Sequence, residues 1–140
     1  MGATFTRSLR VLVAEDEELA ALVIEEVLTG EGHLVTLAPD GAAALDRALQ
    51  AQAAQQEFDV LVTDLAMPRM TGMELIDQLR LSHPNLPVVV MTGFLSPEHA
   101  AELSNQAYPP LALLHKPFRI DSLLAALAGV GPRLIFNAAR

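Results

Sequence analysis

The chain alternates between short apolar segments and longer amphipathic segments, and this alternation limits the possible fold more than any other feature. The short segments are rich in Val, Leu and Ala and are expected to form strands: residues 9–14, 34–38, 58–64, 86–92 and 111–115. The longer segments carry apolar residues at helical spacing and are expected to form helices: residues 17–32, 42–56, 72–83, 96–107 and 120–128. Strict alternation with short connections predicts an α/β fold, in which one parallel sheet has helices on both faces.

Length and composition indicate one globular domain. A chain of 140 residues can bury a substantial core, and a hydrophobic content of 51% argues against disorder. We predict a flexible N-terminal segment over residues 1–8, a domain over residues 9–128 and a tail over residues 129–140. No apolar run approaches the ~18 residues of a membrane span, and the amino end lacks the long apolar region of a signal peptide.

Charge and cysteine content narrow the classes of partner and site. A formal net charge of −8 argues against a nucleic-acid partner, because nucleic-acid binding requires a basic surface. The sequence contains no cysteine, so disulfides and thiolate metal sites are excluded. We therefore expect a cytoplasmic protein that contacts neither nucleic acid nor a membrane.

Polar residues stand at the ends of four of the five predicted strands. Glu15 and Asp16 follow the first strand, Asp64 ends the third, Thr92 ends the fourth and Lys116 follows the fifth. Ligands of an open parallel sheet bind beyond the carboxyl ends of its strands, so these side chains are expected to meet at one edge. Each residue alone has an ordinary structural explanation, such as a helix cap or a β-branched strand position. Their combination indicates a functional site.

The residue types in this group suit phosphoryl transfer. Three carboxylates repel one another unless a cation lies among them, and their hard oxygen atoms suit Mg²⁺. Lys116 is the only lysine in the sequence, and a compact ammonium beside carboxylates and a hydroxyl is what a phosphoryl group requires. Asp64 could itself be the nucleophile and form an aspartyl-phosphate.

This pattern resembles the receiver domain of two-component response regulators, of the kind found in chemotaxis. The resemblance rests on the acidic pair, on an aspartate followed by Pro68 four residues on and Gly72 eight residues on, on a threonine at a strand end, and on a Lys-Pro-Phe triplet. It covers residues 9–128. It implies a doubly wound, flavodoxin-like, five-stranded parallel sheet with the strand order 2-1-3-4-5.

The resemblance also implies a role for each acidic residue. Asp64 would accept the phosphoryl group. Asp16, Asp64 and the backbone carbonyl of Ala66 would bind Mg²⁺, and Glu15 would assist through a water molecule.

Two further residues would act on the phosphoryl group itself. Thr92 would donate a hydrogen bond to a phosphoryl oxygen, Lys116 would pair with the phosphoryl charge, and the peptide bond between Lys116 and Pro117 would be cis, which proline permits. The donor would be a histidine kinase or a histidine phosphotransfer protein, and the output would be contact with an unknown downstream protein. The chain would be a phosphorylation substrate with slow self-dephosphorylation rather than an enzyme acting on other molecules.

Two positions depart from the usual residues of this family: Leu113, and Glu15, which stands where an aspartate is usual and is a chemically mild change. Leu113 stands three residues before the lysine, where similar proteins carry Tyr or Phe, so the usual rotation of an aromatic ring is unavailable and a smaller repacking on phosphorylation is expected. Ala66 and Phe94 stand two residues after the aspartate and the threonine, where side chains line the approach of water to the phosphoryl group. Since neither side chain can orient a water by hydrogen bonding, slow hydrolysis is predicted.

Two alternative functions remain open at this point. A degenerate receiver could bind a partner without phosphorylation, although the complete set of Asp16, Asp64, Thr92 and Lys116 argues against it. A phosphatase of the haloacid-dehalogenase type also forms an aspartyl-phosphate, but it requires a second Asp two residues after the first. That position is Ala66 here, which argues against the phosphatase.

Overall fold

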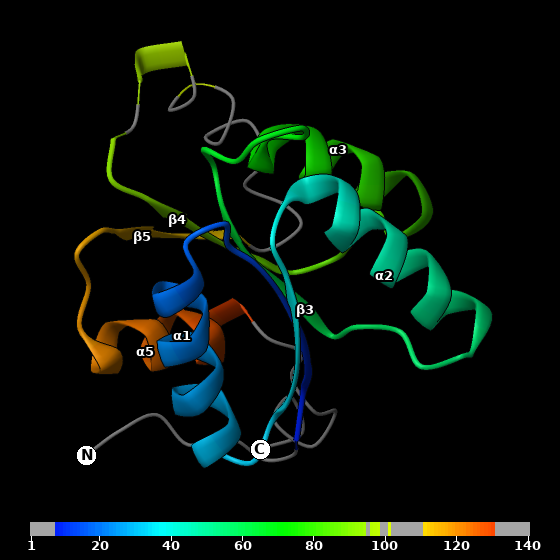
Figure 1. Cartoon of the computed structure of the whole chain (residues 1–140), viewed down its shortest axis with the longest axis horizontal. Coiled ribbons are helices and arrows are strands. Elements are labelled where there is room, and N and C mark those ends of the chain that lie inside the picture. The colour runs from blue at the N-terminus through cyan, green and yellow to red at the C-terminus, as the bar shows by residue number, and fades with distance from the viewer. Residues whose placement is uncertain (1–7, 95, 99–100, 102–110, 131–140) are drawn as a thin grey trace, which may run out of the picture.

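The computed structural model describes residues 8–94, 96–98, 101 and 111–130. In this part of the chain the strands form one five-stranded parallel sheet with the order β2-β1-β3-β4-β5 (Figure 1). The strands are β1 (Arg10–Ala14), β2 (Leu34–Ala38), β3 (Val60–Asp64), β4 (Val88–Thr92) and β5 (Leu111–His115). The described helices are α1 (Glu18–Gly30), α2 (Gly41–Ala53), α3 (Gly72–Ser82) and α5 (Ile120–Val130). The predicted fold class and strand order are confirmed.

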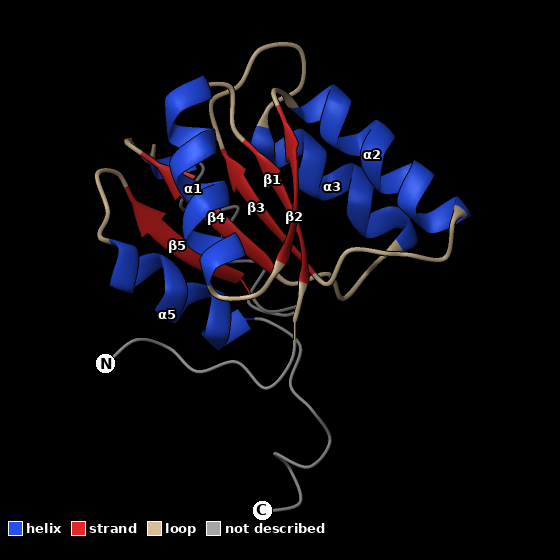
Figure 2. Cartoon of the chain, turned by 60° about the horizontal axis from the view of Figure 1, so that its bottom comes forward, coloured by secondary structure: helices blue, strands red, loops and turns tan. Residues whose placement is uncertain are grey.

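The helices cover both faces of the sheet (Figure 2). Successive residues of a strand point to opposite faces, so β3 contributes to two separate cores. Leu61 packs with residues of α2 and α3, including Ala44 and Ile76. Val60 and Val62 pack on the other face with residues of α1 and α5. A strand buried on both faces must be apolar at every position, which explains the continuous Val and Leu runs of the sequence.

Several predicted element ends are wrong by two or three residues. Helix α2 ends at Ala53 rather than 56, and Gln55 adopts a positive φ of 58°, which a continuing helix does not allow. Strand β3 begins at Val60 rather than 58, because the Asp59 carboxylate instead accepts the backbone N–H of Arg10 at 2.8 Å. Strand β4 begins at Val88, directly after Pro87, which has no N–H to donate.

The ends of the predicted domain fall at the edge of the described residues. Helix α5 continues to Val130, two residues past the predicted end of the domain at residue 128. The N-terminal segment 1–7, the tail after residue 130 and most of the expected helix over 96–107 lie outside the described residues. Among the described residues no helix is both long and apolar enough to cross a membrane.

Candidate functional site

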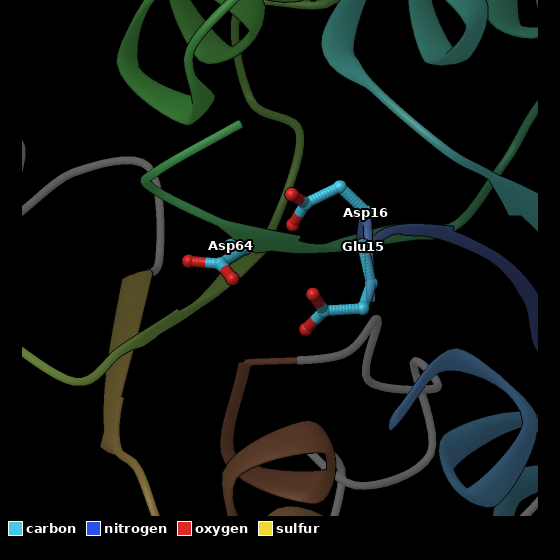
Figure 3. A group of neighbouring side chains, drawn as sticks. All are labelled: Glu15, Asp16 and Asp64. Atoms are coloured by element: carbon cyan, nitrogen blue, oxygen red, sulfur yellow. The ribbon is translucent and has the colours of Figure 1, made fainter. Parts of the chain in front are cut away.

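Three carboxylates meet at the carboxyl edge of the sheet. Glu15 and Asp16 follow β1 directly, and Asp64 is the last residue of the neighbouring strand β3. One carboxylate oxygen from each residue lies within 4.8 Å of the others, and Figure 3 shows the three side chains grouped at the two strand ends. Glu15 and Asp64 are buried, at 2% and 8% exposure, whereas Asp16 is exposed. The predicted acidic cluster is therefore present, and one of its members faces solvent.

Lys116 brings a positive charge to this cluster from the far side of β4. Its Nζ donates to Asp64 Oδ2 at 2.7 Å and to Glu15 Oε1 at 2.8 Å. Its backbone N–H donates to the Thr92 carbonyl at 2.8 Å, which fixes the end of β5 against the end of β4. The Lys116–Pro117 peptide is cis, as the resemblance implied. The lysine thus bridges the two buried carboxylates.

Burial and pairing act in opposite directions on these groups. Burial raises the pKa of Glu15, and this effect exceeds the lowering by Lys116 and by the backbone N–H of Glu17. Burial alone would lower the pKa of Lys116, but its hydrogen bonds to Asp64 and Glu15 and their charges outweigh burial and raise that pKa. The lysine is consequently held in its charged form beside Asp64.

The donor set fits Mg²⁺. It consists of carboxylate oxygens, which hard divalent cations prefer, and three carboxylates against one ammonium leave negative charge to be neutralised. The exposed Asp16 leaves a path by which a hydrated ion can reach the group, and Mg²⁺ usually keeps several of its waters. The acidic cluster is therefore suited to Mg²⁺.

The loop after Asp64 is held tightly against the site. A Cβ atom on Gly72 would lie 2.2 Å from the Asp64 carbonyl oxygen, so only glycine allows α3 to begin there. The Gly72 N–H donates to Leu65 O at 2.9 Å, and Thr71 and Glu74 form a capping box at the start of α3. The Asp64 Oδ1 atom accepts the backbone N–H of Ala66 at 3.2 Å. The spacing of eight residues from Asp64 to Gly72 thus has a steric reason.

The side chains of the other predicted residues lie around this centre, and no side-chain hydrogen bond joins Thr92 to Asp64 within the described residues. Thr92 is buried, and its hydroxyl donates to the Phe94 carbonyl at 2.5 Å and accepts the Phe94 N–H at 3.2 Å. The Phe94 side chain is 77% exposed, and Ala66 is also exposed. Leu113 is 37% exposed on the edge strand β5, where it lies opposite Val90. The Thr92 hydroxyl would have to give up its hydrogen bond to the Phe94 carbonyl before it could donate to a group on Asp64.

The sequence matches the family model of the response regulator receiver domain over residues 11–128. The chain belongs to this family. Receiver domains accept phosphoryl groups in two-component systems, so phosphotransfer is the function of the family and the resemblance found in the sequence is confirmed. Membership of the receiver family argues against the haloacid-dehalogenase alternative.

Known relatives agree with this assignment. The sensory/regulatory protein RpfC of Xanthomonas campestris pv. campestris is 36% identical over 126 residues, which cover 87% of this chain and 16% of RpfC. Response regulator MprA of Mycobacterium bovis is 36% identical over 121 residues, which cover 86% of this chain and 49% of MprA. This receiver chain thus spans a small part of RpfC and about half of MprA.

A solved receiver structure has the same fold along nearly its whole length. The chemotaxis protein CheY4 of Vibrio cholerae superposes with a TM-score of 0.77 at 30% identity, covering 89% of this chain and 99% of CheY4. Receiver domains interact with histidine kinases and with downstream effectors. The regulators among the curated relatives include one named as DNA-binding, NtrC of Escherichia coli, of which this chain covers 23%.

One contact near the site was missing from the sequence predictions. Arg69, in the loop between β3 and α3, forms an ion pair with Asp40, the residue before α2. The sequence Pro39-Asp40-Gly41 had indicated only a turn, and nothing in the spacing of 29 residues indicated a partner. The available signal was an aspartate directly before an expected helix, because a carboxylate that caps a helix with one oxygen can accept from a cation with the other.

Proposed function

We propose that Asp64 is the phosphoryl acceptor of this receiver domain, with a histidine kinase or a histidine phosphotransfer protein as donor. The supporting observation is the position of the Asp64 carboxylate between an acidic cluster suited to Mg²⁺ and the Lys116 ammonium, 2.7 Å from its Oδ2. Asp64 is the only carboxylate of the cluster that ends a central strand of the sheet. The chain is then a phosphorylation substrate in the cytoplasm, and its output is contact with a downstream protein.

The transfer step follows from the groups around Asp64. A carboxylate oxygen of Asp64 forms the new O–P bond while the P–N bond of the donor phosphohistidine breaks, and the imidazole nitrogen keeps the electron pair. The Lys116 ammonium then donates to the phosphoryl oxygens in place of the carboxylates. The Thr92 hydroxyl donates to a phosphoryl oxygen in place of the Phe94 carbonyl. Asp16, Asp64 and the Ala66 carbonyl would hold Mg²⁺, with Glu15 assisting through water, and the ion would neutralise part of the phosphoryl charge.

This proposal is tested by direct phosphorylation of the wild-type chain. Incubation with acetyl phosphate and Mg²⁺ is expected to give a single adduct of about 80 Da in the intact mass, which corresponds to one phosphoryl group. The adduct should be absent when EDTA replaces Mg²⁺. An unmodified chain after prolonged incubation, with a known receiver domain modified in parallel, would instead support the degenerate receiver that binds without phosphorylation.

The donor would approach Asp64 over an apolar surface on α1. Leu19 is 74% exposed and Val23 is 56% exposed, although both are large apolar residues. A hollow of about 470 Å³ beside them is lined in part by Val23, Lys116 and Phe118, so it reaches from α1 to the lysine of the site. We assign this surface to the histidine-bearing helix of the donor, because a helix seated there can present its phosphohistidine at the carboxylate cluster.

The melting temperature of the receiver is expected to rise with Mg²⁺ concentration, since an ion that binds only the folded carboxylate cluster adds to the free energy of unfolding. Asp16→Asn removes one of the repelling charges and one ligand. The metal-free variant should therefore be at least as stable as the wild type, but its melting temperature should no longer respond to Mg²⁺. Differential scanning fluorimetry with and without EDTA measures both effects.

A matched control for this titration is Asp46→Asn. Asp46 is a carboxylate on α2 that bonds Gln50 of the same helix, so its loss changes the net charge equally without touching the cluster. The Mg²⁺ response of this variant should equal that of the wild type. A response retained in Asp16→Asn would show that the ion binds elsewhere.

The phosphoryl group on Asp64 is expected to hydrolyse slowly, because neither Ala66 nor Phe94 can hydrogen-bond an attacking water through its side chain. Positioning and proton transfer contribute about 10²-fold or more to such steps, so Ala66→Asn combined with Phe94→Glu should shorten the half-life roughly tenfold. The decay of ³²P-labelled protein measures the half-life. The two single variants separate the positions, which is useful because the Phe94 side chain is largely exposed. Equal lifetimes in wild type and double variant would contradict the prediction.

A further inference from the structure

An ion pair between Arg69 and Asp40, called the clasp below, joins the loop after Asp64 to the start of α2. The Asp40 Oδ2 atom accepts the Arg69 Nε–H at 2.9 Å and also a hydrogen bond from Arg69 Nη2. The Asp40 Oδ1 atom accepts the backbone N–H of Ala43 at 2.8 Å and so caps the helix. Asp40 is only 4% exposed. Both oxygens of a buried carboxylate are therefore used, one for the helix and one for the loop.

The clasp holds a backbone conformation that is unfavourable for its own residue. Arg69 has a φ of 67°, and the Met70 N–H donates to the Pro68 carbonyl at 2.7 Å across it. This is a γ-turn with a positive φ, which is rare and strained for a residue other than glycine. Such a conformation persists only where the surroundings hold it, and it concentrates at functional sites.

A second contact shows how closely the two segments approach. A Cβ atom on Gly41 would lie 2.5 Å from the Met70 carbonyl oxygen, so the first residue of α2 is glycine where the loop lies against it. The start of α2 therefore contacts the loop at two points: Asp40 bonds Arg69, and Gly41 lies against Met70. The two ends of the loop are also held in place. At its beginning the Leu65 N–H donates to the Met91 carbonyl at 3.2 Å, and at its end helix α3 begins.

We propose that Arg69 is a positioning residue for the metal site: by its clasp on Asp40 it holds the strained turn, and with it the Ala66 carbonyl, beside Asp16 and Asp64. The inference rests on the proposed function, because it takes the Ala66 carbonyl as a Mg²⁺ ligand. Ala66 lies three residues before Arg69 in the same loop, and its N–H already bonds Asp64 Oδ1. Without the clasp the turn can relax toward a negative φ, and the carbonyl loses its fixed position.

Three variants test the clasp by Mg²⁺ titration of the ¹⁵N-labelled full chain, read from the Ala66 amide signal. They are Arg69→Gln, Asp40→Asn and the double variant. Asparagine caps helices about as well as aspartate, so Asp40→Asn keeps the start of α2 while it weakens the clasp. We expect each single variant to raise the Mg²⁺ dissociation constant by up to about fivefold, which is the upper end for a partly exposed ion pair, and the double variant to raise it no further.

The direction in which Arg69→Gln changes the Mg²⁺ affinity distinguishes loss of the clasp from a purely long-range effect of the lost charge. Removing a positive charge near a cation site should tighten Mg²⁺ binding if only long-range electrostatics acted, whereas loss of the clasp should weaken it. Arg10→Gln is the control, because it removes the same charge from β1 at the opposite end of the strand from the site. Arg69→Lys should recover part of the affinity, since lysine keeps the charge but not the two-nitrogen contact.

The outcomes distinguish this inference from the proposed function. Wild-type protein whose Ala66 signal does not respond to Mg²⁺ would overturn the metal site and the positioning role together. A wild-type response combined with equal or tighter binding in Arg69→Gln would overturn the positioning role alone. Chemical denaturation without Mg²⁺ completes the test, because a merely structural clasp would lower the free energy of unfolding and leave the dissociation constant unchanged.

Discussion

Replacing Asp64 with asparagine is expected to abolish phosphorylation of the chain by acetyl phosphate or by a histidine kinase. The amide keeps the size of the carboxylate but has no anionic oxygen that can attack phosphorus. The Lys116 ammonium bonds both Asp64 and Glu15, but of the three carboxylates only Asp64 lies within a strand. The adduct of about 80 Da, given quantitatively by the wild type, should be missing from the intact mass of Asp64→Asn.

The matched control for this experiment lies on the same strand segment. Asp59 precedes β3 at the opposite end from Asp64, and its carboxylate accepts the backbone N–H of Arg10. An asparagine oxygen can accept the same hydrogen bond, so Asp59→Asn should fold and be phosphorylated as the wild type is. Phosphorylation of Asp64→Asn to the wild-type extent would show that another residue is the acceptor. Asp16, the exposed carboxylate of the cluster, would then be the first candidate.

The grouping of the acidic residues could be predicted because it depends on strand order and strand ends. Once the strands of Glu15 and Asp64 are parallel neighbours, their carboxyl ends must lie at one edge, whatever the details of the loops. The same reasoning places Lys116 after β5 at that edge. Chain topology therefore determined these positions, and the side chains had only to span the remaining few ångströms.

Contacts that depend on loop conformation could not be predicted in the same way. The Thr92 hydroxyl bonds Phe94 two residues on, which is a local choice that periodicity does not reveal. The Arg69 backbone adopts a positive φ that its residue type disfavours, so local preference argued against the conformation that tertiary contacts maintain. Positions where local preference and structure conflict are expected at functional sites, which agrees with the place of Arg69 in the loop after Asp64.

Replacing Lys116 with glutamine is expected to slow phosphorylation of Asp64 by about 10²- to 10³-fold, the usual cost of removing one donor that stabilises charge in a transition state. The phosphoryl oxygens would lose their only ammonium partner within the described part of the site, whereas the carboxylates that would bind the metal remain. Lys116→Arg should recover only part of the rate, because the planar guanidinium does not fit the place of a compact ammonium between Glu15 and Asp64. Single-turnover kinetics with acetyl phosphate at saturating Mg²⁺ measure the rate.

A second measurement on Lys116→Gln shows whether the loss is electrostatic or structural. In the wild type the ammonium bonds the same carboxylates that would bind the metal, so its removal should tighten Mg²⁺ binding while phosphorylation falls. It should also raise the pKa of Glu15 further, since Lys116 acts against the effect of burial on that pKa. A group with a raised folded-state pKa stabilises the protein below its ordinary pKa and loses that contribution as pH rises, so metal-free Lys116→Gln should lose stability with rising pH over a wider range than the wild type. Weaker Mg²⁺ binding together with slow phosphorylation would instead mean that Lys116 organises the carboxylates rather than binding the phosphoryl group.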